Sequence, residues 1–159
     1  YSDSDTGVSF SYPDNWVVND RGDPSSVGYL LNVDVHKNDG ANLIFSLVVR
    51  NKDAKDAVIN SGGSPSYSLS TAELIIEPIL VDSVSYSLVG SKNVDVTSEP
   101  IYEIVLRSCT TNTSCAAYLE KGEGSITALI TTEQGHGAPI DLQDDDYKQI
   151  KKIISSLKF

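Results

Sequence analysis

Cys109 and Cys115 are the residues whose type and spacing point most directly to chemistry. Only small polar residues lie between them, and an apolar, strand-like segment flanks each side, so we expect a hairpin closed by a disulfide. Two free thiols or two metal ligands are the alternatives. A metal is disfavoured because zinc needs further ligands, and no histidine or third cysteine lies nearby. A disulfide indicates an oxidising, extracytoplasmic compartment. The same loop holds Asn112 in an Asn-Thr-Ser pattern, which makes it a candidate glycosylation site.

The two histidines, His36 and His136, are the candidate metal ligands, together with Asp34. His36 falls near the end of an expected strand, two residues after Asp34, and His136 lies between two glycines in a loop. The histidines lack metal-ligand spacing to each other, and each has a simple structural interpretation as an exposed loop or strand-end residue. Surface acids could complete a site around His136, so a metal- or small-ligand-binding module is the alternative function.

Sequence motifs of catalysis are scarce. Ser155-Ser156-Leu157-Lys158 matches the Ser-x-x-Lys pattern of penicillin-interacting enzymes, but it would close a terminal helix instead of opening a buried one, and its companion motifs are absent. The sequence also contains no nucleophile elbow of the Gly-x-Ser-x-Gly type and no phosphate-binding glycine loop. We therefore assign no catalytic residue and no cofactor, and expect a protein that is not an enzyme.

Charge and hydropathy narrow the class of partner. The chain of 159 residues has a formal net charge of −10, so it lacks the basic balance of a nucleic-acid-binding protein. An anionic membrane surface would repel it on average. No apolar run approaches the roughly 18–20 residues that span a bilayer, so we expect no membrane insertion within this chain. The partner expected is a protein, and the acidic surface by itself has a simpler role in solubility.

The chain is expected to form one domain over residues 1–159, with residues 1–7 as a flexible leader. It opens on Tyr1 and contains no Met, which is typical of a mature or trimmed chain. A signal peptide or lipid anchor is therefore expected upstream of Tyr1.

Alternating and helical patterns place these residues on an α+β framework. Val8, Phe10 and Tyr12 alternate with small polar residues up to the corner at 13–15, after which Trp16, the only tryptophan, should enter the core with Tyr12. Strands are expected at 8–12, 16–19, 29–36, 42–50, 84–90, 101–108, 115–121 and 125–132, and helices at 51–61, 71–76 and from 144 to the last residues. The final helix has acids at its start, lysines further along and one apolar stripe.

Three segments together resemble the PsbP family. They are the corner Phe10-Ser11-Tyr12-Pro13-Asp14-Asn15-Trp16, the strand entry Ser98-Glu99-Pro100-Ile101-Tyr102-Glu103-Ile104, and the ending with Asp144, Asp146, Tyr147, Ile150, Ile153, Ile154, Ser156, Leu157 and Phe159. The resemblance spans nearly the whole chain. More narrowly, it is to the secreted and lipid-anchored PsbP-like domains of archaea and bacteria.

The resemblance implies an α/β/α sandwich, with a central, mostly antiparallel sheet of about six strands and a C-terminal helix packed on it. It also implies a non-catalytic, extracytoplasmic binding or accessory protein, associated with a membrane or cell-surface complex; the family's namesake is an extrinsic lumenal subunit of photosystem II. No known site is carried onto this chain. Because the corner and the last helix should pack on one core, we expect the readable function on the loops at 20–28, 110–114 and 133–142.

Overall fold

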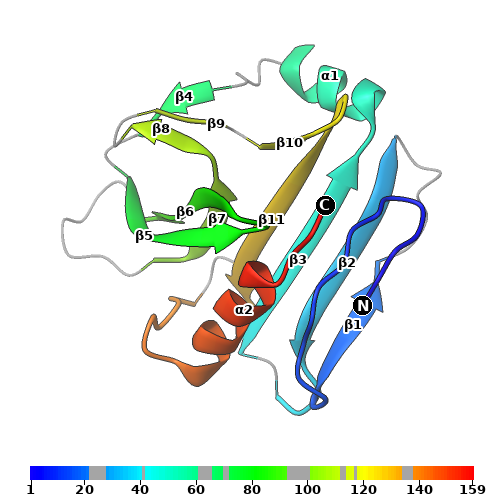
Figure 1. Ribbon diagram of the computed structural model, residues 1–159. Coiled ribbons are helices and arrows are strands. Elements are labelled where there is room, and N and C mark those ends of the chain that lie inside the picture. The colour runs from blue at the N-terminus through cyan, green and yellow to red at the C-terminus, as the bar shows by residue number, and fades with distance from the viewer. Residues whose placement is uncertain are drawn as a thin grey trace.

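The computed structural model describes residues 1–21, 28–40, 42–60, 66–69, 72–92, 101–111, 114–116, 118–133 and 138–159. Its main feature is an antiparallel sheet of eight strands in the order β1-β2-β3-β11-β7-β6-β5, with β10 paired to one end of β11 (Figure 1). The strands are β1 (Trp16–Asp20), β2 (Tyr29–Lys37), β3 (Leu43–Arg50), β5 (Glu73–Val81), β6 (Val84–Ser91), β7 (Glu103–Arg107), β10 (Leu119–Lys121) and β11 (Gly124–Thr132). A smaller sheet contains β4 (Ser66–Ser68), β9 (Ser114–Ala116) and β8 (Cys109–Thr111).

Period-two patterning explains the central strands. In β3 the residues Leu43, Phe45, Leu47 and Val49 are buried, and the residues between them are half-buried. The same alternation runs along β11, which pairs with β3 over its whole length. One face of the sheet therefore forms the core, and the other face is half-exposed along these strands.

The helix α2 (Asp145–Ser155) covers the core face of the sheet and contacts β3 and β5 (Figure 1). It begins where the Asp144 carboxylate accepts a hydrogen bond from the Asp146 backbone N–H at 2.7 Å. Its apolar stripe, which includes Tyr147 and Ile150, is buried in the main core. The predictions of an α+β class, a mostly antiparallel sheet and a C-terminal helix packed on it are confirmed.

The second helix, α1 (Lys52–Asn60), lies at the end of the sheet where β3 ends and β11 begins (Figure 1). The chain turns into α1 directly after β3, and the Asn51 side chain accepts a hydrogen bond from the Ala54 backbone N–H at 3.0 Å. Asn51 is thus the N-terminal cap of α1. A helix layer on each face of the sheet stays a prediction.

The N-terminal corner places Trp16 in the core, where it is 4% exposed. Tyr12 does not follow: it is 37% exposed, so the expectation that it is a core residue is wrong. Phe10 takes the buried place instead, with its ring edge-on to Phe45 at 6.5 Å between centroids. The expected strand at 8–12 has only isolated bridges, and one of them pairs Ser9 with Lys158 through two backbone hydrogen bonds.

Residues 1–7, expected as a flexible leader, form a closed loop. The Asp3 carboxylate accepts hydrogen bonds from the backbone N–H and the hydroxyl of Thr6, at 2.7 and 2.5 Å. The ring of Tyr1 stacks on Phe10 with 4.9 Å between centroids. These contacts attach the loop to the corner.

The sheet has eight strands where about six were expected. The largest difference is at 71–76, where we expected a helix and β5 begins at Glu73. The preference of this segment for a helix is local, whereas β5 forms a full ladder of hydrogen bonds with β6 and places Ile79 and Val81 in the core. Tertiary pairing of β-branched residues has overridden a local helix signal.

Candidate functional site

The two cysteines lie opposite each other in the β8–β9 hairpin, and their sulfurs are bonded at 2.03 Å. This agrees with the expected disulfide. Asn112, the candidate glycosylation residue, lies outside the described residues, so glycosylation stays a prediction.

The polar atoms of His36 and Asp34 have hydrogen-bond or ion-pair partners within the protein, and a metal site at these residues stays a prediction. The Nδ1–H of His36 donates to the Lys37 carbonyl at 2.9 Å, and Nε2 accepts from the Asn19 amide at 2.8 Å. Asp34 is 4% exposed, accepts a hydrogen bond from the Ser46 hydroxyl at 2.6 Å, and pairs with Arg21.

His136 lies outside the described residues. Within the described ranges, no three side chains of His, Cys, Asp or Glu come together in a group that could hold a metal ion. No described helix is long and apolar enough to cross a membrane.

A groove runs between α2 and the β5–β6 hairpin, and we call it the α2–β5 groove. It consists of two adjoining hollows of about 440 and about 500 Å³, which share Lys151 and Ser155. Lys148 and Lys152 complete its helix side. The strand side includes Glu77, Pro78 and Leu80.

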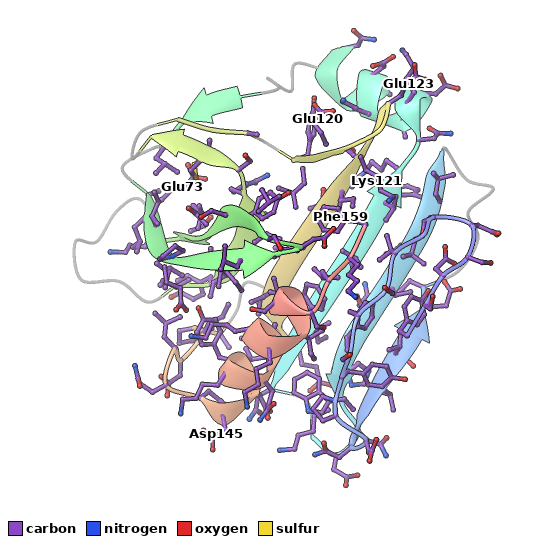
Figure 2. All side chains as sticks on the ribbon, in the orientation of Figure 1. Glu73, Glu120, Lys121, Glu123, Asp145 and Phe159 are labelled. Carbon is purple, nitrogen blue, oxygen red and sulfur yellow. A yellow bond between two sulfur atoms is a disulfide. The ribbon has the colours of Figure 1, made fainter. Side chains whose placement is uncertain are left out.

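The packing of α2 explains which of its side chains face this groove. Its apolar stripe is turned to the sheet, so Lys148, Lys152 and Ser155 fall on the outer face at helical spacing and are exposed. Asp145 lies at the N-terminal end of the same helix and points away from the sheet (Figure 2). The lysines thus follow the acids along α2, as the helix dipole favours.

The other wall, β5, is an edge strand of the sheet that cannot readily pair with a further strand. Its register with β6 shifts between Ile75 and Glu77, which marks a bulge. In this hairpin, hydrogen-bonded pairs alternate with non-hydrogen-bonded pairs, starting from the hydrogen-bonded Val81–Val84 pair beside the turn. Pro78 is therefore in a non-hydrogen-bonded pair, and its backbone faces the open edge of the sheet. Proline has no N–H to donate to a further strand there. A partner at this edge would therefore be held mainly by side chains.

Glu77 connects the two walls. Its carboxylate accepts a hydrogen bond from the Tyr147 hydroxyl at 2.9 Å and lies 2.9 Å from the ammonium nitrogen of Lys151. Burial of Tyr147, followed by the bond to Glu77, raises the pKa of the phenol. Lys151 also lies over the Tyr147 ring, 5.2 Å from its centroid. The charge of Lys151 is thus largely neutralised.

The remaining lysines of the groove are less constrained. Lys148 pairs with Asp145 at 2.8 Å, but the Asp145 side chain is 91% exposed. The hydrogen bond and charge of Lys148 lower the pKa of Asp145. Among the described residues, Lys152 has no ion-pair partner. A chain with net charge −10 therefore carries a local positive face on α2.

One exposed aliphatic side chain lies in the same groove as these lysines. Leu80 is 64% exposed in the groove wall, and Val84, beyond the Asp82-Ser83 turn, is 51% exposed. This site was not predicted from the sequence. The lysines were interpreted only through the helix dipole, and the segment before Leu80 was expected to be helical; an excess of lysine near the end of an acidic chain was the available signal.

A separate, smaller hollow of about 230 Å³ lies between the end of β11 and the start of α2. Asn42, Glu133, Asp141 and Asp144 are among the residues that line it. Two carboxylate oxygens already accept backbone N–H groups, from Gln143 at 2.8 Å and from Asp146 at 2.7 Å.

No protein-family model and no curated protein matches the chain. Two solved structures are similar to it. The solution structure of cyanobacterial PsbP (CyanoP) from Synechocystis sp. PCC 6803 is 15% identical, with a TM-score of 0.46, over 99% of this chain and 89% of that one. A crystal structure from Bacteroides thetaiotaomicron VPI-5482 is 11% identical, with a TM-score of 0.39, over 95% of this chain and 44% of that one. The first bears the name of the family that the sequence resembles; neither assigns a partner or a reaction to this chain.

Proposed function

We propose that this chain is a non-catalytic, extracytoplasmic accessory protein that holds a protein partner of a membrane or cell-surface complex at the α2–β5 groove. The observation that carries this proposal is the meeting of outward lysines and exposed Leu80 in one groove of a chain with net charge −10. Interfaces combine such a desolvated apolar contact with charges that orient the partner.

The chemistry of the groove favours binding over catalysis. Its carboxylate, Glu77, is engaged by Lys151 and Tyr147. A phenol with a raised pKa stays protonated at neutral pH, so Tyr147 is a poor base. The described residues that line the two hollows include neither histidine nor cysteine.

The disulfide supports an oxidising compartment. Protein isolated from its native host under acid quench should resist a thiol-reactive maleimide, and become labelled at both cysteines only after reduction. Free, reactive Cys109 and Cys115 in that protein would refute the extracytoplasmic part of the proposal.

Site-specific photo-crosslinking tests the binding part. A benzophenone amino acid replaces Ser155 in the groove, or Lys121 at the end of β10, beside the turn into β11 and near α1 (Figure 2). In the native host, irradiation should give a discrete crosslinked protein from position 155 and none from position 121. No crosslink at position 155, or the same product from both, counts against the groove.

A metal- or small-ligand-binding module is the second candidate function, and the acidic lining of the smaller hollow, which includes Glu133 and Asp141, supports it. Calorimetric titration with zinc, copper and calcium tests it, with His136→Ala as the matched variant. Heat that disappears in the variant supports this function, and the absence of heat removes it.

A further inference from the structure

We infer that the occupant of the α2–β5 groove is an acidic protein segment with an aliphatic side chain, whose carboxylates meet Lys148 and Lys152 and whose aliphatic group covers Leu80. This inference rests on the proposed function and adds the chemistry of the partner. It commits to a protein segment in preference to a lipid surface.

The outer face of α2 offers positive charge to a partner. Lys152 has no ion-pair partner among the described residues, and Lys148 is held only by an Asp145 side chain that is 91% exposed. Exposed pairs of this kind contribute little, so Lys148 can exchange Asp145 for a partner's carboxylate at small cost. Two ammonium groups one helical turn apart therefore face outward for an acidic segment.

Lys151 and Glu77 lie deeper in the groove. Because the Lys151 ammonium lies 2.9 Å from Glu77, it offers little free charge to a partner. Glu77 would moreover repel a carboxylate placed nearby. Replacing Glu77 by Gln keeps an acceptor for the Tyr147 hydroxyl and frees Lys151, so this substitution should strengthen the binding of an acidic segment.

Leu80 offers an apolar contact to a partner. Leu80 exposes 64% of its surface in the strand wall, beside Pro78, which is also exposed. A single exposed leucine is ordinary on a protein surface. Here it lies in the same groove as the lysines, so one extended segment can contact both. An aliphatic partner residue would bury Leu80 and fix the position of the acids.

The groove suits a short protein segment better than an added β-strand or an anionic membrane. Strand addition to β5 is hindered by the bulge and by the outward backbone of Pro78. An anionic membrane would meet Asp82 at the hairpin tip and a chain with net charge −10. A short acidic segment meets only the local positive face.

Peptide binding to the full chain tests the inference. The probe is a fluorescent twelve-residue peptide of Asp, Glu, Ser and one central Leu, measured by fluorescence anisotropy at low and at 0.5 M salt. Matched peptides replace the Leu by Ser or the acids by Gln and Asn. We expect saturable binding of the first peptide, with loss of about tenfold in affinity at high salt and in each matched peptide.

Variants locate the binding. Lys148→Gln with Lys152→Gln should lower the affinity about tenfold, Leu80→Ser about fivefold, and Glu77→Gln should raise it about threefold. Lys52→Gln with Lys121→Gln changes the net charge equally near α1 and should leave the affinity unchanged. Thermal unfolding followed by circular dichroism verifies that each variant is folded.

Equal binding of all three peptides, or equal effects of the two double variants, would overturn the inference. Binding to vesicles of phosphatidylglycerol and phosphatidylcholine that the groove variants abolish, without binding of the acidic peptide, would also overturn it and assign the groove to a lipid surface. A crosslinked protein at position 155 with no acidic-peptide binding would leave the proposed function standing and refute only this chemistry.

Discussion

Tyr147→Phe should lower stability at neutral pH and raise it, relative to the unaltered chain, in alkali. Tyr147 is 1% exposed, and its hydroxyl makes the 2.9 Å hydrogen bond to Glu77. A hydrogen bond to a charged acceptor contributes about 1.5–3 kcal/mol. Glu77 keeps Lys151 as a partner after the substitution, so we expect the lower part of this range at pH 7.

The pH dependence follows from the raised pKa of Tyr147. Above about pH 10 the unfolded phenol ionises while the folded one keeps its proton, so folding loses stability as pH rises. The loss approaches about 1.4 kcal/mol per pH unit until the folded pKa is reached. Phenylalanine carries no such proton. The difference between the two proteins should therefore vanish near pH 11 and reverse above it.

Urea unfolding followed by circular dichroism at pH 7, 10 and 11 measures this difference. Tyr1 and Tyr86 also have raised pKa values through burial, but both proteins contain them, so their effect cancels in the comparison. Tyr12→Phe, at an exposed position, is the control and should show no crossover. A stability difference between Tyr147→Phe and the unaltered chain that stays constant from pH 7 to pH 11 would refute the raised pKa of the buried phenol.

Three further substitutions test the framework. Gly124→Ala should destabilise the fold strongly, because an added Cβ would lie 2.1 Å from the Arg50 carbonyl oxygen; recovery of the folded protein at normal yield and melting temperature would contradict this close approach. Replacing Cys109 and Cys115 together by Ser should cost about 2–2.5 kcal/mol in the chain-entropy model, measured by urea unfolding beside the reduced native chain. Asp144→Ala removes the N-cap of α2 and should cost about 1 kcal/mol, with Asp144→Asn retaining most of the stability; equal loss in both variants would argue against capping.

Local patterns in the sequence were sufficient for several parts of the fold. The burial of Trp16 followed from a strand that ends in a tight corner, and α2 followed from acids, lysines and an apolar stripe at helical spacing. The hairpin of Cys109 and Cys115 followed from their spacing. In each case the residues that determine the structure are close together along the chain.

The candidate site depended on contacts between distant residues, and the sequence could not show them. Glu77 and Lys151 are 74 positions apart and meet only because α2 packs beside β5. The strand β5 itself is stabilised by pairing with β6, which outweighed the local helix signal before Glu77. The expected loops at 20–28, 110–114 and 133–142 each include residues outside the described ranges, and a role for them stays a prediction.

The joining of the first and last segments has a consequence for the order of folding. The Ser156 hydroxyl accepts the Ser11 backbone N–H at 2.8 Å across 145 positions, next to the bridge between Ser9 and Lys158. Such a contact cannot form until nearly all of these residues have left the ribosome, and α2 covers β3 only then. Until that moment the apolar face of β3 lacks the helix that covers it. The core of this fold is therefore completed late, by segments that lie far apart along the chain.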